Sequence, residues 1–338
     1  RFLPLALLTS GFAAACAAPP PTAEVPAPSD PGTEPYVVMV SFDGMRYDFP
    51  DRVPTPNFAR LADAGVRATG LIPAYPSKTF PNHYTLATGL YPSNHGIVDN
   101  AFYDPAFDAV YALGNRDAVE DGRWYGGEPI WKTAERQGLT AASFFWVGSE
   151  AEGLRPTYWK IYDGDVPNAA RVDTVLSWLQ LPAERRPRIV MLYFSDVDSQ
   201  AHRYGPDAPE VDSAVVALDR LLGRLLDGLE EVPVGARVNV VVVSDHGMAP
   251  VPTENVVYLE DYADLSGVRV LDNSTQTLLY LDGDETRIGA LHDALTGRVP
   301  HAEVRLKEDL PGRWHYSDSR RIGEIVSGIQ PHQEQSLP

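Results

Sequence analysis

Residues 238–248 read VNVVVVSDHGM, an apolar, β-branched run that ends in an adjacent aspartate and histidine. Two other runs have the same form: YVVMVSFD ends at Asp43, and IVMLYFSDVD ends at Asp198. Continuous rather than alternating hydrophobicity predicts strands that are buried on both faces, as in a parallel sheet covered by helices. The run LTAASFFWVG at 139–148 predicts a fourth internal strand.

Helical patterns lie between these runs. The segment 56–64 has proline at its start and Gly65 just past its end, which is typical of a helix. In the segment 209–229, apolar residues recur with the period of a helix, at Val211, Val215, Leu218, Leu222, Leu225 and Leu229. Strands that alternate with helices predict an α/β fold, in which helices flank a central, largely parallel sheet.

Three aspartates at the ends of these runs predict a metal site. Ligands of open α/β sheets gather at the carboxyl ends of the strands, where Asp43, Asp198 and Asp245 are expected to lie. A single aspartate there is by default a helix cap or turn residue, but three favour a site. His246 follows Asp245 directly, and His202 follows Asp198 by four residues, so that the latter pair shares one face of a helical turn. Imidazole and carboxylate ligands favour zinc over manganese or iron.

Residues 76–89 read PSKTFPNHYTLATG and place Thr79 at the N-terminus of a predicted helix that ends at Gly89. Free N–H groups and the helix dipole at this position favour an anion such as phosphate. A threonine hydroxyl needs a base or a metal to act as a nucleophile, and a dinuclear site supplies that activation. Taken alone, Thr79 is explained as a helix cap; beside a metal site, we interpret it as a nucleophile.

The charge of the chain argues against a nucleic-acid polymer as its partner. Acidic residues number 46 against 28 basic residues, and the net charge is −18. Such a charge repels polyanions unless a basic channel exists, and no cluster of lysine and arginine predicts one. A small substrate and bound cations are compatible with this composition.

The first residues predict export from the cell. Residues 1–18 combine a positive start, a short apolar stretch and small residues, as in an export signal, and a Pro/Ala-rich linker follows at 19–35. Cys16 is the sole cysteine. It is either lipidated, as in a bacterial lipoprotein, or removed by cleavage near Ala18. The protein is therefore expected to be periplasmic, anchored to a membrane through Cys16, or secreted.

In order along the chain, the sequence resembles the nucleotide pyrophosphatase/phosphodiesterases of the alkaline phosphatase superfamily. The segments that carry the resemblance are SFDGMRYD, PSKTFPNHYTLATGLYPSNHGIVDN, EPIWKTAERQG, DVDSQAH, SDHGM and LPGRWHYSDSRRIGEI. It covers residues 36–326 as a catalytic domain and leaves 327–338 as an unmatched tail. The resemblance implies an alkaline phosphatase-like fold, two zinc ions, and hydrolysis of nucleotide pyrophosphates and phosphodiesters through a covalent phosphothreonine intermediate.

Other reactions on the same scaffold remain as alternatives. These are a lipid-headgroup phosphodiesterase and a phosphonate or phosphomonoester hydrolase. A chain that keeps the fold but has no turnover is the alternative outside the enzyme class.

The resemblance assigns metal ligands residue by residue. Asp43, Asp245 and His246 would hold the zinc that activates the nucleophile. Asp198 and His202 would hold the second zinc, which serves the leaving oxygen.

The family has a further histidine on the second zinc, in a Gly-x-His-Gly motif beyond the last matching segment. His332 is the only later histidine in this chain, and its polar surroundings do not match that motif. The second site is therefore expected to be incomplete. We expect the chain as given to bind about one zinc ion and to turn over poorly.

The resemblance also assigns residues to the substrate. Asn100 would donate a hydrogen bond to a non-bridging phosphate oxygen, although a turn residue is the simpler explanation of an asparagine in DNAFYD. Phe80 would line the pocket of the nucleobase. Tyr162 would stack across that pocket, and ordinary packing of a buried aromatic is the alternative for it.

Overall fold

The computed structural model describes residues 34–251, 256–271 and 274–329. A five-stranded sheet in the order β5-β4-β6-β1-β7 contains all four predicted runs, and its neighbouring strands are parallel. The strands are β1 (Tyr36–Phe42), β4 (Ala141–Phe144), β5 (Tyr158–Lys160), β6 (Ile189–Phe194) and β7 (Val238–Val243). The predicted α/β fold with a central parallel sheet is confirmed.

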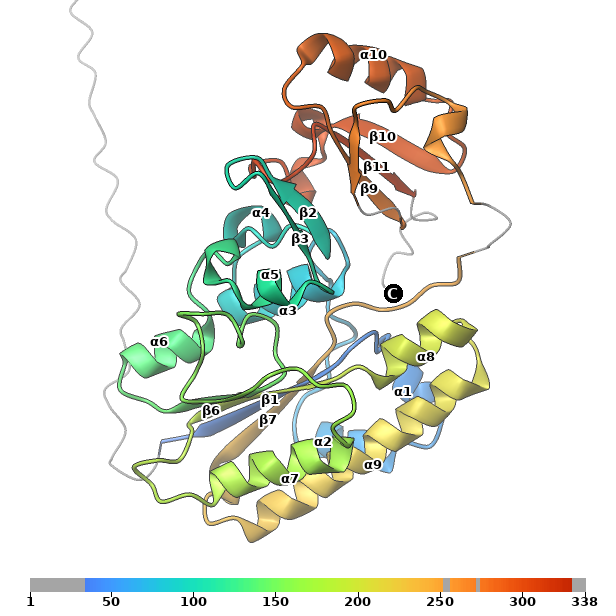
Figure 1. Cartoon of the computed structure of the whole chain (residues 1–338). Coiled ribbons are helices and arrows are strands. Elements are labelled where there is room, and N and C mark those ends of the chain that lie inside the picture. The colour runs from blue at the N-terminus through green and yellow to red at the C-terminus, as the bar shows by residue number, and fades with distance from the viewer. Residues whose placement is uncertain (1–33, 252–255, 272–273, 330–338) are drawn as a thin grey trace, which may run out of the picture. The chain divides into compact units, whose positions relative to one another are not determined.

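Helices cover both faces of this sheet (Figure 1). Val38 and Val40 of β1 belong to the apolar cluster on one face, and Val37 and Met39 belong to the cluster on the other. The first face carries α2 (Pro56–Ala64), α7 (Asn168–Leu179) and α9 (Pro209–Glu231), and the second carries α3 (Thr79–Thr88) and α6 (Ile130–Arg136). The helices predicted at 56–64 and 209–229 are both present.

Shorter elements complete this part of the chain. The helices are α1 (Phe49–Arg52), α4 (Pro92–His95), α5 (Arg116–Glu120) and α8 (Asp196–Tyr204). A hairpin pairs β2 (Ala101–Asp104) with β3 (Ala109–Ala112). Single turns of 3-10 helix include η1 (Gly122–Trp124), η2 (Gly235–Arg237), η4 (Leu259–Asp261), η5 (Lys307–Asp309) and η6 (Gly312–Trp314).

A four-stranded antiparallel sheet in the order β10-β11-β9-β8 comes from the C-terminal part of the chain. Its strands are β8 (Arg269–Leu271), β9 (Gln276–Tyr280), β10 (Ala302–Leu306) and β11 (Ile325–Ile329). The helix α10 (Glu285–Leu295) shares an apolar cluster with this sheet through Leu291 and Leu295. Strand β11 crosses residue 326, where the unmatched tail was expected to follow the catalytic domain.

Several expectations from the sequence fall outside the described residues. They are the export signal at 1–18, Cys16, nearly all of the linker at 19–35, and His332. Among the residues that the structure describes, no helix combines the length and the apolar character needed to cross a membrane.

The expectation that all three aspartate-terminated runs are buried on both faces is wrong for β7. In the described part of the chain β7 pairs only with β1, so it forms an edge of the sheet, and Val241 is 37% exposed. Strand β6 lies between two neighbours, and all of its residues are buried. A continuous apolar run indicates a buried strand, but it does not indicate whether a second strand lies on each side of it.

The run that ends at Asp198 is also not a single strand. Strand β6 ends at Phe194, and α8 begins at Asp196, so Asp198 lies in the first turn of a helix. Carboxylates are favoured there by the positive end of the helix dipole. Asp198 nevertheless lies at the carboxyl edge of the sheet, because its backbone N–H donates a hydrogen bond to the carbonyl oxygen of Asp43 at 3.2 Å.

Candidate active site

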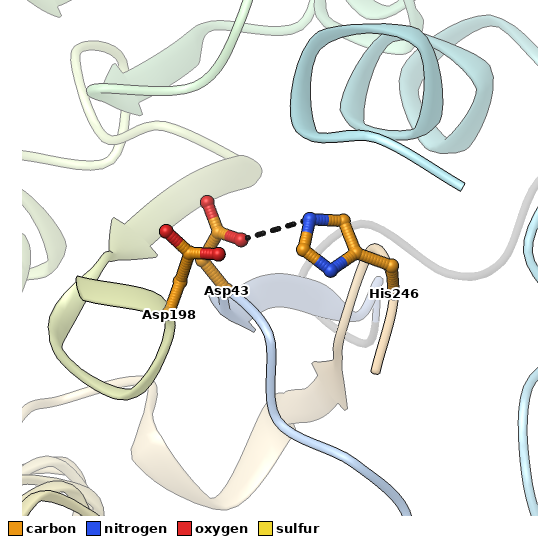
Figure 2. A group of neighbouring side chains, drawn as sticks. All are labelled: Asp43, Asp198 and His246. Atoms are coloured by element: carbon orange, nitrogen blue, oxygen red, sulfur yellow. Dashed lines mark ion pairs between the residues drawn. The ribbon is translucent and has the colours of Figure 1, made fainter. Parts of the chain in front are cut away.

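The structure brings the predicted ligands Asp43, Asp198, Asp245 and His246 together at the carboxyl edge of the parallel sheet. Figure 2 shows the side chains of Asp43, Asp198 and His246 directed toward one another. The Nε2 atom of His246 lies 3.4 Å from Asp43 Oδ1 and 3.3 Å from Asp245 Oδ2. Asp43, Asp198 and His246 each contribute one potential ligand atom, and these three atoms lie within 4.8 Å of one another.

Three carboxylate oxygens in this cluster fit a bound cation. Asp43 Oδ1, Asp198 Oδ1 and Asp245 Oδ2 are buried, and each has an imidazole nitrogen 3.2 to 3.4 Å away. None of these contacts has the geometry of a hydrogen bond, and no other described residue donates to these oxygens. Buried carboxylate oxygens without donors are costly, and native structures contain few of them. A metal ion satisfies such oxygens together, and the mixture of carboxylate and imidazole groups is a donor set that suits zinc.

The electrostatics of the cluster lead to the same interpretation. Burial raises the pKa of the Asp43 carboxyl well above its ordinary value, and the charges of Asp245 and Asp198 add to that effect. Burial also acts to raise the pKa of Asp245, but the imidazoles of His83 and His246 outweigh it and lower this pKa to about 2. Like charges are thus held together away from water, an arrangement that a cation stabilises.

Gly44 allows the chain to turn at the centre of the cluster. Its φ angle is +68°, in the left-handed region that favours glycine, and a Cβ atom here would lie 3.0 Å from the Cα of Asp198. Its N–H donates a hydrogen bond to Asp245 Oδ1 at 3.2 Å. This glycine therefore brings the segments that follow β1, β6 and β7 into contact.

Two buried residues that the sequence analysis did not single out support the carboxylates. The hydroxyl of Tyr193 donates to Asp43 Oδ2 at 2.6 Å, and His83 Nδ1 lies 3.2 Å from Asp245 Oδ2. Partners of this kind fix the orientation of metal-ligand carboxylates. Each had a signal in the sequence: Tyr193 interrupts the apolar run IVMLYF with a hydroxyl, and His83 follows Thr79 by four residues, on the same face of a helix.

Thr79 is the first residue of α3, next to the carboxylate cluster. Its Oγ1 lies 3.3 Å from His246 Nε2. Lys78, rather than Thr79, occupies the capping position of the helix. The alternative in which Thr79 acts as the helix cap is therefore wrong, and its hydroxyl lies beside a candidate metal ligand.

Asn100 and Phe80 are held against each other beside Thr79. The backbone N–H of Phe80 donates a hydrogen bond to Asn100 Oδ1 at 3.0 Å. With its oxygen engaged in this way, the Asn100 side chain has its amide nitrogen as the donor for a ligand. The Phe80 ring makes an edge contact with Tyr111, at 6.2 Å between centroids.

Tyr162 follows β5 and lies one aromatic ring away from the cluster. Its ring packs at 5.1 Å from Phe145 and at 6.3 Å from Tyr193, whose hydroxyl binds Asp43. The side chain remains partly exposed, with 41% of its surface accessible. Tyr162 thus combines packing on one side with an accessible surface for a ligand.

His202 forms a less buried part of the site. The i, i+4 spacing in α8 brings its Nε2 to 3.2 Å from Asp198 Oδ1, but its side chain is 71% exposed, against 7% for His246. The neighbouring carboxylate of Asp198 raises the pKa of His202. In the described part of the chain, His202 joins no group of three ligand-type residues. The pair is therefore a weaker candidate site than the cluster around Asp43.

A family model described as type I phosphodiesterase / nucleotide pyrophosphatase matches residues 37–333. The chain belongs to this family. The match contains the carboxylate cluster, Thr79 and Asn100, and it continues beyond strand β11. The resemblance that the sequence motifs indicated is confirmed.

Curated relatives of this phosphodiesterase family member come from fungi and animals. An uncharacterized pyrophosphatase/phosphodiesterase of Schizosaccharomyces pombe is 38% identical over 299 residues, which are 86% of this chain and 61% of the relative. Ectonucleotide pyrophosphatase/phosphodiesterase family member 1 of Mus musculus is 37% identical over 314 residues, which are 90% of this chain and 34% of the relative. The chain thus spans 61% or less of the length of these two relatives.

Solved structures share the fold. Murine ectonucleotide pyrophosphatase/phosphodiesterase 5 superposes with a TM-score of 0.81 and 33% identity, covering 87% of this chain and 78% of the solved chain. An inactive threonine-to-alanine variant of the same murine protein was solved in complex with AMP, and it superposes with a TM-score of 0.82 and 33% identity, covering 88% of this chain and 79% of that one.

Proposed function

We propose that this chain is an exported zinc-dependent hydrolase of nucleotide pyrophosphates and phosphodiesters, with Thr79 as its nucleophile. One observation carries the proposal: the Thr79 hydroxyl, at the start of α3, lies 3.3 Å from His246. His246 belongs to a cluster with three carboxylates, each of which has one buried oxygen that accepts no hydrogen bond from the described residues. The family match and the AMP complex of the murine relative support the substrate class.

Two groups of side chains would hold the metal ions. Asp43, Asp245 and His246 form the buried group, and Asp198 with His202 forms the more exposed one. When bound, the ions would lower the pKa of the attacking hydroxyl and offset negative charge on the leaving oxygen. Tyr193 and His83 would keep the ligand carboxylates oriented.

The chain's own groups around Thr79 suit phosphoryl transfer. The hydroxyl oxygen of Thr79 would attack phosphorus, the bond to the leaving oxygen would break, and a phosphothreonine would form. Water would then attack the same phosphorus and release Thr79. The backbone N–H of Thr79, the first residue of α3, and the amide of Asn100 would donate hydrogen bonds to the non-bridging oxygens.

Two aromatic residues would favour nucleotides over simple esters. Phe80 follows the nucleophile directly, and Tyr162 lies near Tyr193 with an accessible surface. Base-to-aromatic stacking on such rings is typically worth about 1–3 kcal/mol. In the sequence around Thr79, PSKTFPNH, no arginine is present that would bind a dianionic monoester through two hydrogen bonds.

The proposal is tested by comparing substrates on the purified chain supplied with zinc. A dinucleotide and bis-p-nitrophenyl phosphate are expected to be cleaved faster than p-nitrophenyl phosphate. Phe80→Ala is expected to raise KM for the dinucleotide and to leave KM for bis-p-nitrophenyl phosphate nearly unchanged. Faster cleavage of p-nitrophenyl phosphate would favour the monoesterase alternative, and preference for p-nitrophenylphosphorylcholine would favour the lipid-headgroup alternative.

A further inference from the structure

The buried carboxylate of Asp99 joins segments that are far apart in the sequence. Its Oδ1 accepts a hydrogen bond from the N–H of Asn100 at 2.6 Å and lies 3.0 Å from the Nζ of Lys78. Its Oδ2 accepts a hydrogen bond from Gln276 of β9 at 2.8 Å. One carboxylate therefore connects the residue before Thr79, the residue after itself, and the antiparallel C-terminal sheet.

Lys78 stands directly before Thr79, as Asp99 stands directly before Asn100. The side chain of Lys78 is 11% exposed, and the residue occupies the N-cap position of α3. The backbone on this side of Thr79 is held by Asn82, whose Nδ2 donates to the carbonyl oxygens of Lys78 at 3.1 Å and of Pro76 at 2.8 Å. The Lys78 ammonium is thus anchored at a defined place relative to the nucleophile.

These contacts and the chain itself form a closed loop that includes Thr79 and Asn100. The chain from Lys78 through Thr79 leads to Phe80, whose N–H donates to Asn100 Oδ1. From Asn100 the chain leads back to Asp99, whose carboxylate meets the Lys78 ammonium. Because every member is held on two sides, a shift of the ion pair shifts the Thr79 hydroxyl relative to the Asn100 amide.

We propose that Lys78 and Asp99 form a positioning pair, which holds the nucleophile Thr79 and the donor Asn100 at the separation that phosphoryl transfer requires. This inference rests on the proposed function. Replacing both members of a buried ion pair changes net stability little, since desolvation offsets much of their attraction, whereas removing one member leaves the other charge buried without its partner. Small displacements of reacting groups, by contrast, have large effects on rate. When both members are replaced, the contribution of this pair is therefore expected in the rate more than in the stability.

The chain contains a matched control for this pair. The Asp104 carboxylate is fully buried, and its Oδ2 accepts a hydrogen bond from Arg321 Nε at 2.6 Å. Like the Asp99 contacts, this pair ties the region around β2 to the C-terminal part of the chain. Neither Asp104 nor Arg321 is next in sequence to a proposed site residue.

The test compares Asp99→Asn, Lys78→Met, the double variant and Asp104→Asn, each measured for kcat, KM and Tm. Both single variants are expected to lose about 10- to 100-fold in kcat, with KM for a dinucleotide changed much less. The double variant is expected to lose no more than either single one, because the two residues act as a unit. Asp104→Asn is expected to lower Tm while kcat stays within about twofold. Lys78→Arg, which keeps the charge, is expected to recover part of the rate.

Four results would overturn the proposal. The first is an Asp99→Asn variant whose kcat equals that of the unchanged chain. A second is loss of rate in Lys78→Met alone, which would mean that Lys78 acts on the substrate directly. A third is additive losses in the double variant. The fourth is an equal loss of kcat in Asp104→Asn, which would reduce the pair to a structural role.

A second readout separates this proposal from the proposed reaction. In a Thr79→Ala background, AMP binding is measured by calorimetry with and without Asp99→Asn. Misplacing the Asn100 amide is expected to weaken AMP binding about tenfold, as for a lost hydrogen bond to a charged group. If the unchanged chain cleaves no phosphodiester, the proposed function fails, while this difference still supports the positioning pair. Equal AMP affinity in the two backgrounds contradicts it.

Discussion

Two groups of buried aspartates differ in what surrounds them. At the carboxyl edge of the parallel sheet, Asp43 and Asp245 each have an oxygen that accepts no hydrogen bond from the described residues. Beside the β2–β3 hairpin, Asp99 and Asp104 have hydrogen-bond donors on both oxygens. Both groups are equally removed from water, so burial alone does not distinguish a binding site from a structural contact.

One carboxyl from each group, Asp43 and Asp104, shows pKa values that move in opposite directions. Burial raises the pKa of Asp43 well above the ordinary range, with neighbouring carboxylates adding to the effect. Burial also acts on Asp104, but hydrogen bonds from Arg320 and Arg321 outweigh it and lower the pKa to about 2. The Asp104 carboxylate therefore favours the folded chain, whereas the Asp43 carboxylate opposes folding until a cation binds.

The largest effect that separates the two regions is expected at Thr79, beside the group of Asp43 and Asp245. Thr79→Ala is expected to lower kcat on a dinucleotide by on the order of 1000-fold or more, because a nucleophile is removed. Zinc content and Tm are expected to change little, since Lys78 and not Thr79 caps α3. A Thr79→Ala chain that keeps most of its activity would show that another group attacks phosphorus.

The next largest effect is expected at Asp104, both of whose oxygens accept hydrogen bonds from arginines. Asp104→Asn leaves the buried guanidinium of Arg321 without its charged partner, so the free energy of unfolding is expected to fall by about 3 kcal/mol. Urea denaturation measures this change. Zinc binding by the same variant should match that of the unchanged chain. A loss of zinc without a loss of stability would reverse the roles given to the two regions.

A smaller effect is expected in the pH dependence of stability, measured on chain treated with a chelator. Asp104 has a lowered pKa, so its contribution is present above about pH 4 and is lost as pH falls toward 2. Asp43 has a raised pKa, so the folded chain loses stability as pH rises above about 4.

Matched variants separate these two contributions. Asp43→Asn is expected to remove the decline at rising pH, and Asp104→Asn is expected to remove the decline at falling pH. Identical pH profiles for the two variants would contradict the comparison.

The sequence predicted those parts of the site that depend on local pattern. Apolar runs that end in aspartate indicated a parallel sheet, and Asp43, Asp245 and His246 do lie together at its edge. The spacing of Asp198 and His202 indicated a shared helix face, which α8 provides. These features follow from strand direction and helix geometry alone.

Features that depend on long-range pairing were not predictable in this way. The exposed edge position of β7 depends on which strands lie beside it, and the pattern VNVVVV does not encode that. The contacts of Tyr193 with Asp43 and of Gln276 with Asp99 join residues more than a hundred positions apart. The antiparallel C-terminal sheet was missed because its short strands have no strong periodicity.

The most direct test of the account is the zinc content of the purified chain after dialysis, measured by elemental analysis beside His246→Ala and His202→Ala. The buried group around Asp43 and His246 should hold about one zinc ion per chain, because three protein ligands suffice for tight binding. His246→Ala should lose that ion. His202→Ala should keep it, since His202 is largely exposed. A chain that retains no zinc, or a His246→Ala variant that holds as much as the unchanged chain, would contradict the claim that the carboxylates around Asp43 form a metal site.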